Sequence, residues 1–250
     1  QSHSLQGTTM QYTTVLLLAL GVVGEGAVKW TAENADKKTC LIFAAETINV
    51  NLHILNTDNV TEPISFSINE TQKVTGNCNG QYNGQPANEL VVSFFPNGEQ
   101  PASATEGQPW RLMLWFTSAD PESFKLADYT LETAFTSAFN STIQNFTKAA
   151  TAELDVHASG TNGFKCSTSG LALTDDSTID LKDTKMIAHA LLPSPDFPAE
   201  QGFEQCLLDS RTSDIVPIVV GACLAGLVAV VLVAYLVGRA RAKRQGYASV

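Results

Sequence analysis

Apolar and polar residues alternate in several segments of the chain, and this alternation predicts β-strands. Every second residue is apolar in 48–54, 64–68 and 110–116. A period of two places such side chains on one face of a half-buried strand. Less regular segments predict further strands at 89–95, 125–133, 163–166, 177–181 and 185–192. Turn-forming residues punctuate these segments at Asn83-Gly84, Pro96-Asn97-Gly98, Asp120-Pro121 and Gly160-Thr161-Asn162-Gly163.

Many short strands separated by turns predict an all-β fold, an antiparallel sandwich or a related form. Residues 28–214 have a suitable length for a single domain of this class. One segment, 134–152, could be argued as a helix. Its threonine-rich composition argues against a helix, because threonine loses side-chain freedom there.

The first of two continuous apolar runs, 15–23, has the length of a signal peptide and is too short to span a bilayer. Small residues follow at 24–27, so we expect a signal peptide over 10–27, with Met10 as the initiator. The n-region contains no Lys or Arg, which is unusual for such a peptide. The alternative is a buried strand of a soluble protein.

The second apolar run, 215–237, is 23 residues long and carries no charge. At 1.5 Å per residue a helix of this length reaches about 35 Å, enough to cross a hydrocarbon core of about 30 Å. Pro217 would lie in its first turn, where its missing N–H costs little. Basic residues follow the run and would stay on the cytosolic side. We therefore predict a transmembrane helix at 215–238, a luminal domain at 28–214 and a cytosolic tail at 239–250. A buried core helix would not explain the basic residues, which are Arg239, Arg241, Lys243 and Arg244.

The predicted luminal part is acidic. It holds 11 Lys plus Arg and 24 Asp plus Glu, and 11 − 24 gives a net charge of −13. This charge argues against nucleic acid as a partner. No CxxC or HxxxH spacing occurs, so we expect no metal site, and no motif indicates a cofactor.

Four of the five cysteines fall in the predicted luminal part: Cys40, Cys78, Cys166 and Cys206. An even number of cysteines in an oxidising compartment predicts two disulfides. Four cysteines allow three pairings, and the spacing does not choose among them. Cys223 lies within the predicted span and is expected to be a small packing residue.

Four N-x-Ser/Thr sequons occur, and all lie in the predicted luminal part. Each marks an expected glycosylation site on the surface, since a glycan cannot be packed into a core. The acceptor residues are Asn59, Asn69, Asn140 and Asn145.

The span is followed by a short basic tail and by Gly246-Tyr247-Ala248-Ser249-Val250 at the end. In these features the C-terminal part resembles the lysosome-associated membrane glycoproteins, the LAMP family. The segments 163–166 (GFKC) and 203–209 (FEQCLLD) also resemble the family's second cysteine pair. The resemblance covers most of residues 40–250. It implies a β-prism-like domain with sequential disulfides, Cys40–Cys78 and Cys166–Cys206. It also implies residence in lysosomal and late endosomal membranes, a protective glycan coat and a role in autophagic and endosomal fusion. The best-known members carry two such domains joined by a hinge, whereas this chain has one and fewer sequons.

Tyr247 and Val250 form a Tyr-x-x-Φ pattern preceded by Gly246, in which Φ is a bulky apolar residue. Such a peptide binds in an extended form, with its two anchors in separate pockets of an adaptor's medium subunit. We therefore expect adaptor complexes and the lipid bilayer as partners. A row of small residues in the span, Gly221, Ala225 and Ala229, could let two helices approach. Self-association through the span or the luminal domain is therefore a further prediction.

Catalysis is not expected. The histidines within the predicted mature chain are His53, His157 and His189, and none lies in a nucleophile or metalloprotease motif. His53 should lie on the polar face of a strand and His189 inside the strand 185–192, while Asp175-Asp176 resembles loop charges. The stronger alternative is a plasma-membrane or endosomal receptor or adhesion protein that uses the tail for endocytosis.

Overall fold

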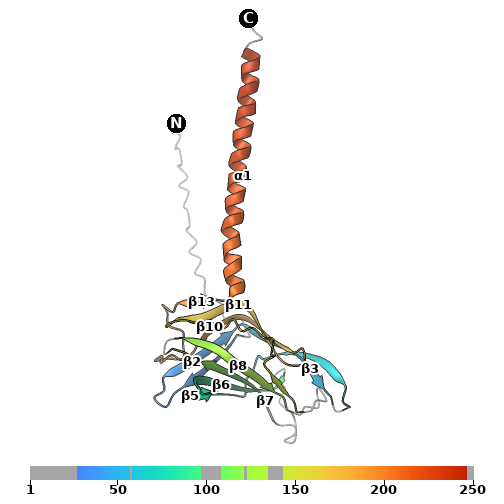
Figure 1. Cartoon of the computed structure of the whole chain (residues 1–250), viewed down its shortest axis with the longest axis vertical. Coiled ribbons are helices and arrows are strands. Elements are labelled where there is room, and N and C mark those ends of the chain that lie inside the picture. The colour runs from blue at the N-terminus through green and yellow to red at the C-terminus, as the bar shows by residue number, and fades with distance from the viewer. Residues whose placement is uncertain (1–26, 57, 97–107, 121–122, 135–142, 247–250) are drawn as a thin grey trace, which may run out of the picture.

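The computed structural model describes residues 27–56, 58–96, 108–120, 123–134 and 143–246. Within this part of the chain, strands β1 to β13 form one seven-stranded and one six-stranded sheet, and a single long helix follows them. The predicted all-β fold with one apolar helix is therefore confirmed (Figure 1). The predicted signal peptide lies outside the described residues.

The seven-stranded sheet has the order β1-β2-β12-β11-β13, and β3 and β4 continue it beside β12. Its neighbours are antiparallel except for β13, which runs parallel to β11. The strands are β1 (Val28–Glu33), β2 (Thr39–Ala45), β3 (Thr47–Leu55), β4 (Thr61–Ser67), β11 (Gly163–Ala172), β12 (Thr178–Ile187) and β13 (Phe203–Gln205).

Strand β12 corrects the prediction of two strands at 177–181 and 185–192. It is one continuous strand that pairs first with β3 and then with β2. Asp183 lies between the two pairings with φ 47°, and it is exposed beside the exposed Lys182. This irregularity shifts the phase of the buried positions by one residue, so the apolar pattern appears broken although the strand continues.

The six-stranded sheet has the order β10-β8-β7-β6-β5, with β9 also beside β8. Strands β5 and β6 form a hairpin whose turn residues, Asn83 and Gly84, have φ angles of 51° and 77°. Two positive φ angles are typical of the type I′ turn, and Asn-Gly is its favoured sequence. The strands are β5 (Lys73–Tyr82), β6 (Gln85–Phe94), β7 (Trp110–Thr117), β8 (Phe124–Glu132), β9 (Asn145–Thr147) and β10 (His157–Ala158).

The core consists of inward-facing side chains from both sheets. Trp110 is 1% exposed, its ring lies edge-on to Phe66 at 5.4 Å, and its indole N–H donates to the carbonyl of Ala134 at 3.0 Å. Strand β1, at the edge of the seven-stranded sheet, and strand β5, at the edge of the six-stranded sheet, approach each other closely. A Cβ on Gly76 would lie 2.1 Å from the Cβ of Ala32, so only glycine allows this approach.

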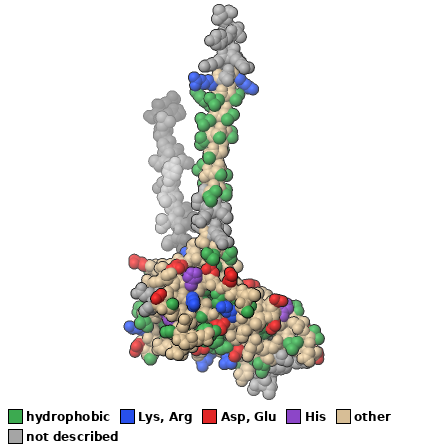
Figure 2. All heavy atoms as spheres, viewed as in Figure 1, with side chains coloured by type: hydrophobic (Ala, Val, Ile, Leu, Met, Phe, Trp, Pro, Cys, Tyr) green, Lys and Arg blue, Asp and Glu red, His purple; other side chains and the backbone are tan. Residues whose placement is uncertain are grey.

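Helix α1 (Leu207–Gly246) stands out from one side of the β domain (Figure 1). Its segment Ile218–Arg239 is long and apolar enough to cross a membrane, and none of it is buried. Apolar side chains cover this segment, and basic side chains lie towards its far end (Figure 2). The helix begins earlier than the predicted span, so Pro217 lies in its interior and not in its first turn. The carbonyl of Ser213 therefore lacks its usual helical donor.

Candidate membrane anchor and its attachment to the β domain

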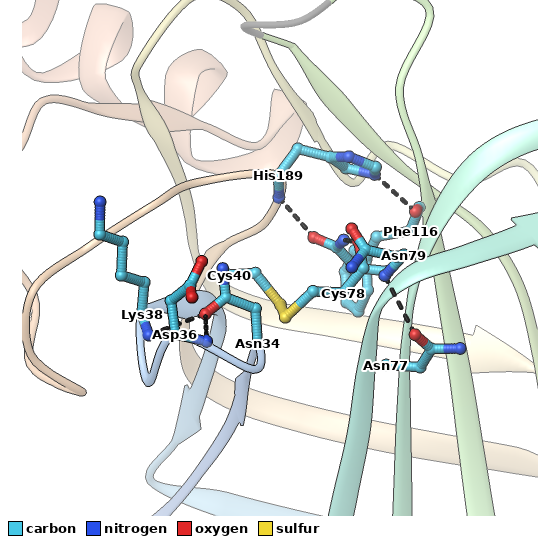
Figure 3. Close-up of a disulfide and its surroundings, with 10 residues drawn as sticks. Asn34, Asp36, Lys38, Cys40, Asn77, Cys78, Asn79, Phe116 and His189 are labelled. Atoms are coloured by element: carbon cyan, nitrogen blue, oxygen red, sulfur yellow. Dashed lines mark hydrogen bonds between the residues drawn. A yellow bond between two sulfur atoms is a disulfide. The ribbon is translucent and has the colours of Figure 1, made fainter.

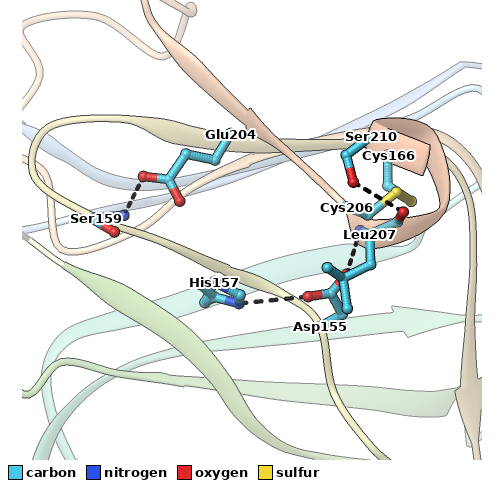
Figure 4. Close-up of polar contacts among 8 residues, drawn as sticks. All are labelled: Asp155, His157, Ser159, Cys166, Glu204, Cys206, Leu207 and Ser210. Carbon is cyan, nitrogen blue, oxygen red and sulfur yellow. Dashed lines mark hydrogen bonds and ion pairs between the residues drawn. A yellow bond between two sulfur atoms is a disulfide. The ribbon is translucent and has the colours of Figure 1, made fainter. Parts of the chain in front are cut away.

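A disulfide joins the foot of α1 to the seven-stranded sheet. Cys206 directly follows the edge strand β13 and directly precedes α1. It is bonded to Cys166 of β11, with the two Cα atoms 5.2 Å apart (Figure 4). Both cysteines are at least 97% buried. The helix is thus attached covalently, through Cys206, to a strand at the interior of the sheet.

Two carboxylates, one on each side of the contact, connect the first turn of α1 to the β domain. The N–H of Leu207 has no acceptor within the helix, and it donates to Oδ2 of Asp155 at 2.6 Å (Figure 4). Asp209 in the same turn accepts from the N–H of Ser167, next to Cys166, at 2.7 Å. A negative charge at a helix N-terminus is also favoured by the helix dipole.

Glu204 of β13 holds a neighbouring loop at the same side of the domain. Its carboxylate accepts from the N–H of Ser159 at 2.8 Å and from the side-chain amide of Asn162 at 3.3 Å. The bond from Ser159 lowers the pKa of Glu204 from its usual value. Glu204 is therefore a charged acceptor that ties the loop after β10 to the strand that leads into α1.

Two carboxyl groups share a hydrogen bond at the bend between β2 and β3. The bond between Glu46 and Asp183 raises the pKa of Asp183 and lowers that of Glu46. Lys182 lies 3.3 Å from the Glu46 carboxylate and favours its charged form. Because both carboxyl groups are exposed, we assign this pair no measurable part of the stability.

The other disulfide connects the two sheets. Cys40 of β2 is bonded to Cys78 of β5, with a Cα–Cα distance of 5.8 Å (Figure 3). The structure thus has the sequential pairing that the LAMP resemblance implies. Beside this bond the buried Asn88 donates to the carbonyl of Cys78 at 2.8 Å, and it accepts from the N–H of His189 at 2.6 Å.

His189 does not lie inside a strand as the sequence predicted. Strand β12 ends at Ile187, and His189 has φ 55° in the segment that follows. Its ring Nε2 lies 2.8 Å from the carbonyl of Phe116, which connects this segment to the six-stranded sheet (Figure 3). Its contacts are thus those of a histidine that joins the two sheets.

Three of the four sequons lie among the described residues, and all three are near the edges of the two sheets. Asn59 precedes the edge strand β4 and Asn69 follows it, while Asn145 begins the short outer strand β9. All three side chains are exposed. The side chain of Gln144 donates to and accepts from the backbone of Leu55, both at 3.0 Å, and brings β9 towards the β3–β4 end of the domain. Asn140 lies outside the described residues.

The sorting pattern lies at the far end of α1. Gly246 is the last residue of the helix, and Tyr247 and Val250 lie outside the described residues. Arg239 and Arg241 are exposed just beyond the apolar segment.

The remaining polar groups form no catalytic arrangement among the described residues. His53 is exposed on its strand, as predicted, and His157 lies 3.8 Å from Asp155 on the surface. Cys166, Cys206 and Asp209 lie close together, but the two sulfur atoms are bonded to each other. Only the Asp209 carboxylate would remain for a metal ion, and one carboxylate does not make a site.

The attachment residues Asp155 and Glu204 were not identified from the sequence. Asp155 contacts Leu207 across 52 residues, and Glu204 contacts Ser159 across 45. No local pattern relates residues so far apart. The one signal present was the position of Cys206 shortly before the apolar run at 215–237.

Comparison with known proteins agrees with this architecture. Residues 216–248 match the family model described as lysosome-associated membrane glycoprotein 2, transmembrane segment. Lysosome-associated membrane glycoprotein 1 of Rattus norvegicus is 25% identical over 219 residues, which cover 86% of this chain and 46% of the rat protein. The chain thus spans about half the length of this relative. The Homo sapiens protein of the same name is 55% identical over 47 residues, 19% of this chain and 11% of the human protein.

The β domain also resembles a solved structure. The membrane-proximal domain of mouse lysosome-associated membrane protein 1 superposes with a TM-score of 0.53 at 18% identity, over 73% of this chain and 98% of that one. At this identity the likeness establishes the fold. In the matched apolar segment, in the similarity along most of its length, in the two disulfides and in this fold, the chain is similar to the lysosome-associated membrane glycoproteins.

Proposed function

We propose that this protein is a non-enzymatic glycoprotein of the lysosomal membrane, with its β domain in the lumen and a short sorting tail in the cytosol. The observation that carries the proposal is the attachment of the β domain to a single apolar helix by the Cys166–Cys206 bond and the Asp155 contact. The similarity to the lysosome-associated membrane glycoproteins supports the lysosomal location. Residence in late endosomes, transient passage through the plasma membrane and a part in autophagic fusion extend the proposal.

Glycans at the exposed sequons would protect both the protein and the membrane below it. Sheet edges carry unpaired backbone groups that can pair with another chain. Glycans on Asn59 and Asn69 would flank the edge strand β4, and a glycan on Asn145 would cover β9. Bulky hydrophilic groups there would hinder edge pairing and access of hydrolases. This arrangement supports a protective role of the luminal surface.

The tail supplies the sorting function in this proposal. A tyrosine side chain buries apolar area while its hydroxyl finds a polar partner, and a bulky apolar residue fills a second pocket. Tyr247 and Val250 provide these two anchors, and Tyr247 lies about eight residues beyond the apolar segment Ile218–Arg239. The expected partners are the medium subunits of adaptor complexes.

Replacement Tyr247→Ala is expected to move the protein from lysosomes to the plasma membrane and to raise its surface fraction several-fold. The measurement is surface biotinylation together with lysosomal fractionation of cells that express the intact chain or the variant. Ser249→Ala is the matched control, since it changes the same tail without removing an anchor. If the intact chain and Tyr247→Ala both reside at the surface, the receptor or adhesion alternative holds and the lysosomal proposal is wrong.

A further inference from the structure

An open pocket of about 530 Å³ lies where the β5–β6 hairpin meets strands β7, β8 and β10. Its lining includes three basic side chains, Lys125, Lys148 and His157, together with Tyr82 and Thr117. The volume is within the range of about 300–1,000 Å³ typical of small-molecule sites. Of these basic groups only His157 lies beside a residue that attaches α1, 3.8 Å from Asp155.

The charge of the pocket is opposite to that of the domain around it. Residues 28–214 carry 24 acidic and 11 basic side chains, yet among the described residues that line the pocket there is no Asp or Glu. Lys125 of β8 stands directly opposite His157 of β10 in the antiparallel register. His157 itself lies 3.8 Å from the carboxylate of Asp155, so a bound anion would be held by the ammonium groups of the two lysines.

The two lysines retain donors for a ligand. The Nζ of Lys148 donates one long bond, 3.4 Å, to the carbonyl of Ala127. Neither Lys125 nor Lys148 has an ion-pair partner among the described residues. The nearby carboxylate of Asp128 instead accepts from the phenol of Tyr82 at 2.5 Å. This bond holds the Tyr82 ring at the wall of the pocket, where it also packs 5.8 Å from Trp115.

A buried hydroxyl group in the wall lacks a partner. Thr117 is 1% exposed, and its Oγ1 has no hydrogen-bond partner among the described residues. A buried polar group without a partner costs free energy, and a ligand hydroxyl that displaces the atoms covering Oγ1 would supply this partner. The side-chain amides of Asn83 and Gln85 also line the pocket and can donate or accept.

We propose that this pocket binds a monosaccharide that carries a carboxylate. The carboxylate is held by the ammonium groups of Lys125 and Lys148, and the sugar hydroxyls bond to Thr117, Asn83 and Gln85. The apolar body of the Tyr82 ring lies against the sugar ring. A small carboxylate without a sugar ring would contact only the two lysines. A neutral sugar would leave their ammonium groups without a counter-ion.

The test is calorimetric titration of the full chain, held in nanodiscs of neutral phosphatidylcholine, with glucuronic acid, glucose and acetate. Glucuronic acid and glucose differ only at the carboxylate-bearing carbon, so they isolate the charge, and acetate isolates the sugar ring. Glucuronic acid is expected to bind at least about tenfold more tightly than either control, because a hydrogen bond to a charged group outweighs a neutral one. Equal binding of glucose or of acetate, or no binding of glucuronic acid at millimolar concentration, overturns the proposal.

Substitutions of the residues that line the pocket test whether the ligand binds there. Lys125→Gln and Lys148→Gln are each expected to weaken glucuronic acid about tenfold. Thr117→Val should weaken it without lowering the melting temperature, since the hydroxyl has no partner to lose. Lys73→Gln, an exposed position on β5 outside the pocket lining, is the matched control and should bind as the intact chain does. A loss with Lys73→Gln equal to that with Lys125→Gln would show attraction to overall charge and would contradict the site.

Discussion

Replacement of both Cys40 and Cys78 by alanine is expected to lower the free energy of unfolding of the β domain by about 4 kcal/mol. The bond closes a loop with a sequence separation of 38 residues, and loss of that closure frees the unfolded chain. It also joins β2 of one sheet to β5 of the other, at the edge where Gly76 meets Ala32. For a domain of this size the melting temperature should fall by about 10 °C.

Scanning calorimetry of the full chain in detergent measures this effect. Cys223→Ala is the matched control, because it removes a cysteine that forms no disulfide and lies in the apolar helix. The melting temperature of the control should equal that of the intact chain. If the double variant has the same melting temperature as the intact chain, the Cys40–Cys78 disulfide does not stabilise the folded β domain.

Replacement Trp110→Ala is expected to destabilise the β domain by about 3–5 kcal/mol. The indole is almost fully buried, packs edge-on against Phe66, and donates to the carbonyl of Ala134. The substitution would therefore leave a cavity and a buried carbonyl without its donor.

Trp115 of the same strand is the matched control, since it faces the outer surface and is only partly buried. Trp115→Ala should cost about 1–2 kcal/mol, close to an average substitution. Chemical denaturation of the two variants is monitored by far-ultraviolet circular dichroism. This signal is chosen because each variant lacks one tryptophan, which would alter a fluorescence signal. Equal losses would mean that the assignment of the two faces of β7 is wrong.

The strands that the sequence predicted best have one buried and one exposed face. In β3 and β7 the apolar residues occupy alternate positions, and the structure buries these positions. Strand β2 was missed because its residues are almost all buried, so no alternation appears. Strand β5 was missed because it lies at a sheet edge and is largely exposed and polar. A sequence pattern reports a strand clearly only when its two faces differ.

The attachment of α1 depends on contacts that no local pattern contains. The apolar segment was visible from its length, but the helix begins eleven residues before the candidate span, at Leu207. These residues, 207–217, are held at their start by Asp155 and the disulfide of Cys206. As a helix they add about 16 Å between the β domain and the apolar segment. The β domain would therefore stand at a set height above the membrane surface.

The pocket lined by Lys125, Lys148 and His157 could not be predicted from a local sequence pattern either. Lys125, Lys148 and His157 are scattered in sequence, and they share one pocket because β9 and β10 both pair with the same edge of β8, opposite β7. The orphan hydroxyl of Thr117 appears only when burial and hydrogen bonds are known. Sequence alone could identify the acidic character of the domain, but not this local exception to it.

The orientation of the chain in the lysosomal membrane is tested most directly by protease protection of purified lysosomes, followed by removal of N-linked glycans. With intact lysosomes the protease should remove only the predicted cytosolic tail, 239–250. The protected fragment should keep both disulfides, and N-glycosidase should lower its mass by up to four glycans, at Asn59, Asn69, Asn140 and Asn145. Digestion of the β domain in intact lysosomes, or a mass that N-glycosidase leaves unchanged, would contradict a luminal glycoprotein domain.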